Sequence, residues 1–157
     1  MILIKVGDCA QRLKGLEDNS VDAIICDPPY GLKFMSKGWD DIGEGSQQRE
    51  WHRAWLTEAH RVLKPNGVLK AFSGSRTFHH LIAMMEELGF QDLSVSAWAY
   101  GSGFPKSHNL AKQFEKDPLS AEEVKTWDGW GTALKPAFEP VVIGYKPKCF
   151  DKPRMGE

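Results

Sequence analysis

The sequence predicts an α/β fold with a mainly parallel β-sheet, because short apolar runs alternate along the chain with segments of helical periodicity. The chain has 157 residues, which fits one domain, and its 41% apolar and 26% charged composition is ordinary for a soluble protein. Two long polar segments, residues 31–49 and 101–136, interrupt the alternation. Segments of that length are usually functional or disordered, so we expect them to border a site.

The expected strands are short runs rich in β-branched and aliphatic residues, each bounded by turn residues. They cover residues 2–6, 21–26, 68–72, 93–100 and 140–145. The run from 21 to 26 leads directly into an acid and two prolines. Each proline removes a backbone N–H and fixes its own φ, so this strand ends abruptly in a stiff loop.

The expected helices lie between these strands. They cover residues 9–16, 48–63, 76–88 and 107–116. The second is the clearest, because its apolar residues from Trp51 to Leu63 fall on one helical stripe. Lys64-Pro65-Asn66-Gly67 stops that helix, and Gly89 closes the next one.

Three polar residues follow expected strands directly. They are Asp8, Asp27 and Ser73. The carboxyl ends of parallel strands meet at one edge of a sheet, and ligands of open α/β sheets bind outside that edge. We therefore expect these three side chains to share one rim.

The loop Asp27-Pro28-Pro29-Tyr30 carries groups suited to a flat heterocycle with an amino group. An ionised Asp27 and the carbonyl of Pro28 are two acceptors on a rigid frame, and together they can hold both protons of an exocyclic amine. Held in this way, the nitrogen lone pair points out of the ring plane toward an electrophile. Tyr30 supplies a ring for base stacking, worth roughly 1–3 kcal/mol. That suits a base flipped out of a duplex.

These residues resemble the catalytic motif of the S-adenosylmethionine-dependent amino methyltransferases of DNA, in particular the adenine type of phages and bacteria. Four further segments match the same family in the same order. They are Gly7-Asp8-Cys9 with Asp18-Asn19-Ser20-Val21-Asp22, Arg61–Val68, Gly103–Leu110 and Trp130–Pro140. The resemblance covers nearly the whole chain and implies a Rossmann-like methyltransferase sheet.

The resemblance also implies roles for individual residues. Asp27, Pro28, Pro29 and Tyr30 would be catalytic, and Asp8, Cys9, Asp27 and Ser73 would face S-adenosylmethionine. Contacts to double-stranded DNA would come from Lys33, Trp39, Lys106, Ser107, His108, Asn109, Trp130 and Lys135. Residues 1–157 would form a single catalytic domain in which residues 101–136 are a target-recognition insertion.

Several of these residues also have a purely structural explanation. Asp8 suits a helix N-cap as well as a cofactor contact, and both roles are compatible. Ser73 can equally belong to a turn, and Lys33 with Trp39 can belong to a solvated loop. Trp130 lies among glycines, where packing and closure over a substrate are equally open.

One family feature is missing from the sequence. Members with an N-terminal catalytic motif carry a later cofactor-binding segment of the form Phe-x-Gly-x-Gly, and no such segment occurs here. We therefore expect an incomplete sheet and a fragment, a split enzyme or a degenerate copy. A second chain or a C-terminal part would complete the cofactor site, and without it exposed sheet edges would favour association.

The cysteine, histidine and charge content restricts the cellular compartment and the ligands expected for this protein. Three cysteines without a CxxC pair indicate a reduced, cytoplasmic protein. The family resemblance implies that the cell is bacterial or phage-infected. No apolar run is long enough to cross a membrane, and the histidines show no metal-ligand spacing. A formal charge of −1 argues weakly against tight non-specific DNA binding, although a local basic face remains compatible with it.

Two alternative functions stay open. The exocyclic amine of cytosine could be the target, since the Asp at the head of the motif favours adenine by family resemblance only. Alternatively, the chain could be a non-catalytic DNA-binding subunit or remnant that does not bind cofactor alone.

Overall fold

The computed structural model contains two compact units. The first is formed by residues up to Ala97 and from Glu139 onward, and the second is Trp98–Phe138. The residues whose structure is described are 2–33, 38–99, 101, 109–115, 121–131 and 138–148.

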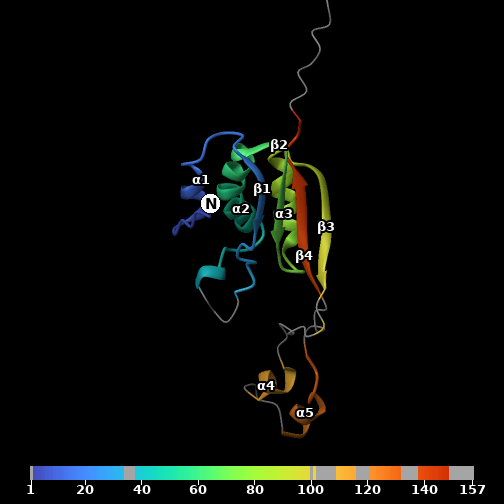
Figure 1. Ribbon diagram of the computed structural model, residues 1–157. Coiled ribbons are helices and arrows are strands. Elements are labelled where there is room, and N and C mark those ends of the chain that lie inside the picture. Colours follow the sequence, from blue (N-terminus) through green and yellow to red (C-terminus); the bar gives the residue numbers. More distant parts are fainter. Residues whose placement is uncertain are drawn as a thin grey trace, which may run out of the picture. The chain divides into compact units, whose positions relative to one another are not determined.

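Four strands form one sheet in the order β1-β2-β4-β3 (Figure 1). They are β1 (Val21–Cys26), β2 (Leu63–Phe72), β3 (Gln91–Ala99) and β4 (Phe138–Tyr145). Strand β1 pairs in parallel with β2, whereas β2 pairs with β4 in antiparallel fashion. The predicted α/β fold is confirmed, but the sheet is mixed, because the last strand pairs with β2 in the reverse direction.

The helices of the first unit are α1 (Cys9–Leu13), η2 (Gly38–Asp40), α2 (Ser46–Val62) and α3 (Phe78–Glu87). Sequence periodicity located α2 and α3 to within two residues at every end. The short 3₁₀ turn η2 was not predicted, because it lies in a polar segment without periodicity. Gly89 follows α3 with a φ of +86°, as expected for a glycine that ends a helix.

The core lies between these helices and the central strand. Helix α2 packs against both α1 and α3. Its Leu56 and Ala59 are fully buried, as are Leu69 and Ala71 of β2 and Met84 of α3. Truncating a leucine buried to this degree costs about 2–5 kcal/mol, so α2 owes its position mainly to this contact.

Strand β2 begins earlier than the sequence predicts. Residues 64–67, expected as a stop, lie inside it as an irregularity where the register against β1 shifts between Val21 and Ala23. Asn66 has a φ of +62°, and an added Cβ at Gly67 would lie 2.7 Å from the Lys64 carbonyl oxygen. Residues 64–67 therefore have the turn-like backbone that the sequence predicts, but β2 begins before them rather than after them.

The predicted strand at residues 2–6 is wrong. This run contains no strand, and its apolar side chains are exposed, with Ile2 at 90% and Ile4 at 84%. Strand β1 is at an edge of the sheet, and its Ile25 is 72% exposed. A β-branched run needs a neighbouring strand to pair with, and the described residues supply none next to 2–6.

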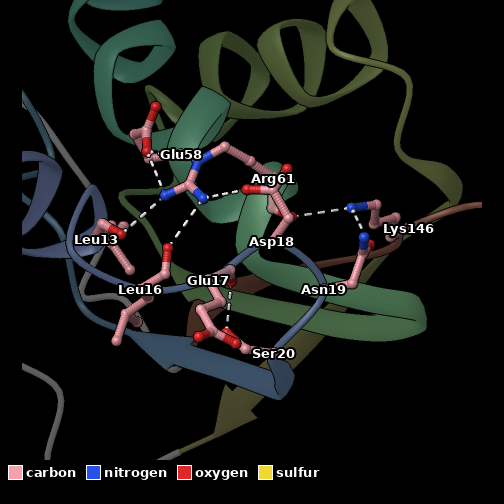
Figure 2. A network of polar contacts seen from close by, with 9 residues as sticks. All are labelled: Leu13, Leu16, Glu17, Asp18, Asn19, Ser20, Glu58, Arg61 and Lys146. Carbon is pink, nitrogen blue, oxygen red and sulfur yellow. Dashed lines mark hydrogen bonds and ion pairs between the residues drawn. The ribbon is translucent and has the colours of Figure 1, made fainter.

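A polar network ties the amino end of β1 to the end of α2 (Figure 2). The Arg61 guanidinium donates to the carbonyl oxygens of Leu13 and Leu16, both at 3.0 Å. It also pairs with Asp18 and, at 2.8 Å, with Glu58. Leu13 is the last residue of α1, and Leu16 lies in the turn after it, so the cation holds the end of this helix and the following turn.

The second unit contains the short helices α4 (Leu110–Phe114) and α5 (Ala121–Thr126). A bridge between Asn109 and Gly131 joins its two described ends. The Trp127 ring packs edge-on against Phe114 and Trp130, with centroid distances of 5.6 and 6.2 Å. In neither unit does any described helix have the length and apolar character needed to cross a membrane.

Candidate active site

The candidate site begins where β1 ends. The last ladder pair joins Cys26 to Ala71 of β2, so the loop that starts at Asp27 and the turn that starts at Ser73 emerge at the same edge. Asp27 is exposed, whereas Pro28, Pro29 and Tyr30 are half-buried. The expected juxtaposition of Asp27 and Ser73 at one rim is therefore observed.

A buried carboxylate, which the sequence did not predict, holds the backbone of the loop that starts at Asp27. Asp40 is only 2% exposed. Its Oδ1 accepts the backbone N–H of Tyr30 at 2.8 Å and of Gly31 at 3.0 Å, and its Oδ2 accepts that of Leu32 at 3.1 Å. Nothing in the sequence distinguishes Asp40 from its exposed neighbour Asp41, so no local signal would have found this contact.

Gln48 at the start of α2 supports the same loop from its carbonyl side. Its Nε2 donates to the carbonyl oxygens of Gly31 at 3.1 Å and Gly43 at 2.9 Å. Gly31 has a φ of +68°, and an added Cβ there would lie 2.5 Å from that nitrogen. Glycine is required at this position both by its backbone conformation and by the close approach of Gln48.

Tyr30 lies beside two carboxylates. Its hydroxyl donates to Glu139 Oε2 on β4 at 3.4 Å. Burial raises the pKa of Tyr30 above its ordinary value, and hydrogen bonding and charge from Asp27 and Glu139 raise it further. The phenol therefore stays neutral at pH 7, and the site gathers acceptors on Asp27 and Glu139 beside an aromatic ring.

The turn after β2 packs directly against this loop. An added Cβ at Gly74 would lie 3.1 Å from Leu32 Cδ1 and 3.4 Å from Tyr30 Cβ. Ser73 is 3% exposed, and its N–H donates to the Pro140 carbonyl oxygen at 3.0 Å. The backbone of the turn thus joins β4 to the edge that carries Tyr30.

Asp8 and Cys9 lie at the start of α1. Asp8 Oδ1 accepts the N–H of Gln11 at 2.9 Å, so this residue is the N-cap. Burial raises the pKa of the Cys26 thiol to about 12, with smaller contributions from Cys9 and Asp27. Cys9 and Asp27 are therefore both close to this thiol.

The residues expected to contact DNA fall into three groups. Lys33 and Trp39 follow the catalytic loop; the Lys33 ammonium pairs with Glu44 at 3.0 Å, and Trp39 is 62% exposed. Asn109 and Trp130 belong to the second unit, where Asn109 Oδ1 caps α4 by accepting the Lys112 N–H at 3.1 Å. The remaining four lie outside the described residues: Lys106, Ser107, His108 and Lys135.

A family model described as DNA methylase, N6_N4_Mtase, matches residues 21–153. The chain belongs to this family. The matched region contains the Asp27–Tyr30 loop and its supports Asp40 and Gln48, together with Glu139 on β4.

One relative of this DNA methylase is the type II methyltransferase M.HpaI of Haemophilus parainfluenzae. It is 35% identical over 106 residues, which is 67% of this chain and 34% of that protein. The fold is similar to that of the PvuII DNA methyltransferase, a cytosine-N4-specific enzyme, with a TM-score of 0.62 at 20% identity over 91% of this chain and 48% of the other.

A second similar structure is a DNA modification methylase of Thermus thermophilus in complex with S-adenosyl-L-methionine. Its TM-score is 0.57 at 17% identity, over 96% of this chain and 55% of that one. This DNA methylase chain therefore spans between a third and just over half of the length of these proteins. The match covers 67% of this chain for M.HpaI and more than 90% for the two solved structures, while much of each relative has no equivalent here.

Proposed function

We propose that this chain is the catalytic and target-recognition part of an S-adenosylmethionine-dependent DNA methyltransferase that modifies the exocyclic amine of adenine. The observation that carries the proposal is the loop after β1. There an exposed Asp27 lies beside the neutral Tyr30 on a backbone that Asp40 holds in place. The family match and the resemblance of the motif to the adenine type support the same reaction.

The residues of the loop act by orienting the amine. The Asp27 carboxylate and the Pro28 carbonyl accept its two protons, so that the nitrogen lone pair is directed out of the plane of the base. Bound S-adenosylmethionine would supply an electrophilic methyl group. The bond between this methyl group and sulfur would break as the new N–C bond forms, and the Asp27 carboxylate would hold the amine proton that must leave. Orientation of this kind lowers the barrier without a covalent enzyme intermediate.

Tyr30 binds the base in this proposal. Its ring is half-buried at the edge of the site, and its hydroxyl is held by Glu139 at 3.4 Å. A stacked base is worth roughly 1–3 kcal/mol by alanine substitution, which offsets much of the cost of leaving the duplex. Lys33 and Trp39 would contact the DNA around the vacated position, and the second unit, with Asn109 and Trp130, would read the target sequence.

The residues of this chain offer contacts to one side of the cofactor only. The exposed Asp27 and Cys9 are both close to the Cys26 thiol, and Asp8 precedes Cys9 as the cap of α1. The two carboxylates offer acceptors for a polar ligand. Ser73 is buried, so it would contribute through the backbone of its turn. A glycine-rich Phe-x-Gly-x-Gly segment does not occur in the sequence. These four residues would therefore form one wall of the S-adenosylmethionine site.

A second chain or a further C-terminal part would supply the other wall. Parallel strands are normally covered on both faces, yet β1 is a parallel edge strand whose Ile25 is 72% exposed. The apolar side chains of residues 2–6 are exposed as well. The lengths of the relatives, of which this chain covers a third to about a half, agree with a complementing part.

The reaction is tested by incubating the complete assembly, which is this chain together with the part that supplies the other wall, with S-adenosylmethionine and double-stranded DNA. The DNA is then digested to nucleosides and the product is identified by mass spectrometry. N6-methyladenine is the expected product, and N4-methylcytosine would overturn the choice of base. Asp27→Ala should abolish the product while leaving the fold intact. The matched control is Asp22→Ala, on the same strand and exposed, which should retain activity. Retained activity in Asp27→Ala would contradict the role given to this residue.

A calorimetric titration of S-adenosylmethionine into the isolated chain separates the enzyme from its non-catalytic alternative. Saturable one-to-one binding would mean that the chain holds the cofactor alone. DNA binding without cofactor binding would instead support a subunit that needs a partner.

A further inference from the structure

The buried Asp40 carboxylate lies against the backbone of the catalytic loop, residues 27–32. Pro28 and Pro29 have no N–H, so the first backbone donors after Asp27 are those of Tyr30, Gly31 and Leu32. Asp40 accepts all three, at 2.8, 3.0 and 3.1 Å. Successive N–H groups that converge on one anion form a strongly bound arrangement, and here the anion is a side chain of the same protein.

The anchor leaves the loop little freedom. The ladder of β1 fixes the backbone at Cys26, and Asp40 fixes it again from Tyr30 onward. Between these points φ is locked at both prolines, and the peptide bonds are planar. Only φ of Asp27 and the ψ angles of residues 27–29 remain soft. The directions of the Asp27 carboxylate and of the Pro28 carbonyl therefore depend on where Asp40 holds the next residues.

We propose that Asp40 is a positioning residue, which sets the direction of the amine acceptors on Asp27 and Pro28 through the backbone N–H groups of Tyr30, Gly31 and Leu32. This inference rests on the proposed function for its catalytic consequence. Its structural content stands on the three hydrogen bonds alone. Gln48 assists from the carbonyl side by holding Gly31 at 3.1 Å.

The substitution Asp40→Asn isolates this role with little change in shape. Oδ1 can still accept from Tyr30 and Gly31, but an amide nitrogen in place of Oδ2 faces the N–H of Leu32, so two donors meet. The charge that strengthens all three hydrogen bonds is lost as well. The matched control is Asp41→Asn, because Asp41 is the next residue, exposed, and 4.0 Å from the Lys33 ammonium.

Amide hydrogen exchange, measured by NMR on the full-length chain, tests the anchor without requiring activity. In the wild type the N–H groups of Tyr30, Gly31 and Leu32 should be protected. In Asp40→Asn their protection should fall about tenfold or more, since a charge-assisted hydrogen bond is worth at least a factor of ten. Amides of Leu69 and Ala71 should stay protected, and Asp41→Asn should match the wild type throughout.

Two exchange results would overturn the inference. One is a wild type whose three loop amides exchange as fast as an exposed segment. The other is a uniform loss of protection in Asp40→Asn that includes Leu69 and Ala71, because Asp40 would then serve the fold rather than the loop.

The catalytic consequence has its own readout. Methyl transfer by Asp40→Asn should show a kcat about ten- to a hundredfold lower, with the KM for S-adenosylmethionine unchanged within about twofold. An unchanged kcat beside selective loss of loop protection would overturn the positioning role. A complete wild-type assembly that transfers no methyl group would count against the proposed function, while the exchange experiment on this chain would still decide whether Asp40 anchors the loop.

Discussion

The two ends of β1 are held by side chains of opposite charge: a guanidinium at the amino end and a carboxylate at the carboxyl end. At the amino end the Arg61 guanidinium donates to two carbonyl oxygens and pairs with two carboxylates, so the charges of this network are matched internally. At the carboxyl end the Asp40 carboxylate accepts three N–H groups, and beyond them Asp27 stays exposed. One end is closed by its own contacts, and the other uses its contacts to present a reactive group.

Helix α2 connects these two ends. Gln48, in its first turn, holds Gly31, and Arg61, in its last turn, holds the segment that follows α1. With 17 residues and a rise of about 1.5 Å per residue, the helix is about 25 Å long. A disturbance in the middle of α2 should therefore reach both ends, whereas one near a terminus should reach only its own.

Leu56→Ala should have the largest effect on stability and should loosen both ends of β1 together. Leu56 is fully buried near the middle of α2, so truncation should lower the free energy of unfolding by about 2–5 kcal/mol. Urea denaturation measures this loss. Exchange of the amides next to Arg61 and next to Asp40 should accelerate together, and acceleration at one end alone would contradict the connection through α2.

A fall in pH should act through the first half of α2. Burial, with a smaller effect from the charge of His80, lowers the pKa of His52 from 6.5 to about 4. The unfolded chain therefore binds more protons between pH 6.5 and 4, and stability is lost as the pH falls through this window. His52 alone should contribute a loss of about 2 kcal/mol between pH 7.5 and 5.

Thermal unfolding across this pH range measures the effect. His52→Gln keeps an acceptor for the Trp55 Nε1–H, which lies 3.2 Å from His52 Nδ1, and should flatten the profile. The control is His79→Gln, an exposed position in α3, where the slope should not change. An equally flat profile in both variants would remove His52 as the cause.

Gly31→Ala should weaken the carboxyl end selectively. Its φ of +68° costs an alanine about 1–2 kcal/mol, and the added Cβ must displace Gln48 Nε2 from 2.5 Å. Urea denaturation should show a loss larger than this backbone cost alone, with faster exchange at Tyr30 and Leu32. Gly45→Ala is the control for backbone strain alone, because it has a φ of +55° and open space around the position. Equal effects of both substitutions would show that the contact with Gln48 does not matter.

Lys64→Ala should have the smallest effect on stability, and its comparison with Arg61→Ala should identify which contact holds the amino end of β1. Lys64 pairs with Asp22 of β1 at 2.6 Å, but both side chains are largely exposed. Exposed pairs of this kind contribute about 0–1 kcal/mol. Arg61→Ala should lower the urea midpoint more than Lys64→Ala does. The reverse order would mean that the surface pair, rather than the Arg61 network, fixes this end.

The sequence predicted the α/β class, the helices α2 and α3, and the loop with Asp27 and Tyr30, because periodicity and proline chemistry are local properties. It did not predict the contacts that position the loop. Asp40 and Gln48 lie between 5 and 17 residues from the groups they hold, and neither differs locally from its neighbours. The strand expected at residues 2–6 failed for the same reason, since a strand needs a partner that no local pattern supplies.

The buried thiol at the end of β1 has a consequence for chemical labelling. With a pKa of about 12, only about one Cys26 side chain in ten thousand is a thiolate at pH 8, and the thiolate is the form that alkylating reagents attack. Cys9 is exposed at the start of α1, close to Cys26. Of these two thiols, maleimide reagents should modify Cys9 and spare Cys26. A fluorophore can therefore be attached beside the proposed cofactor wall without damage to the strand that carries the catalytic loop.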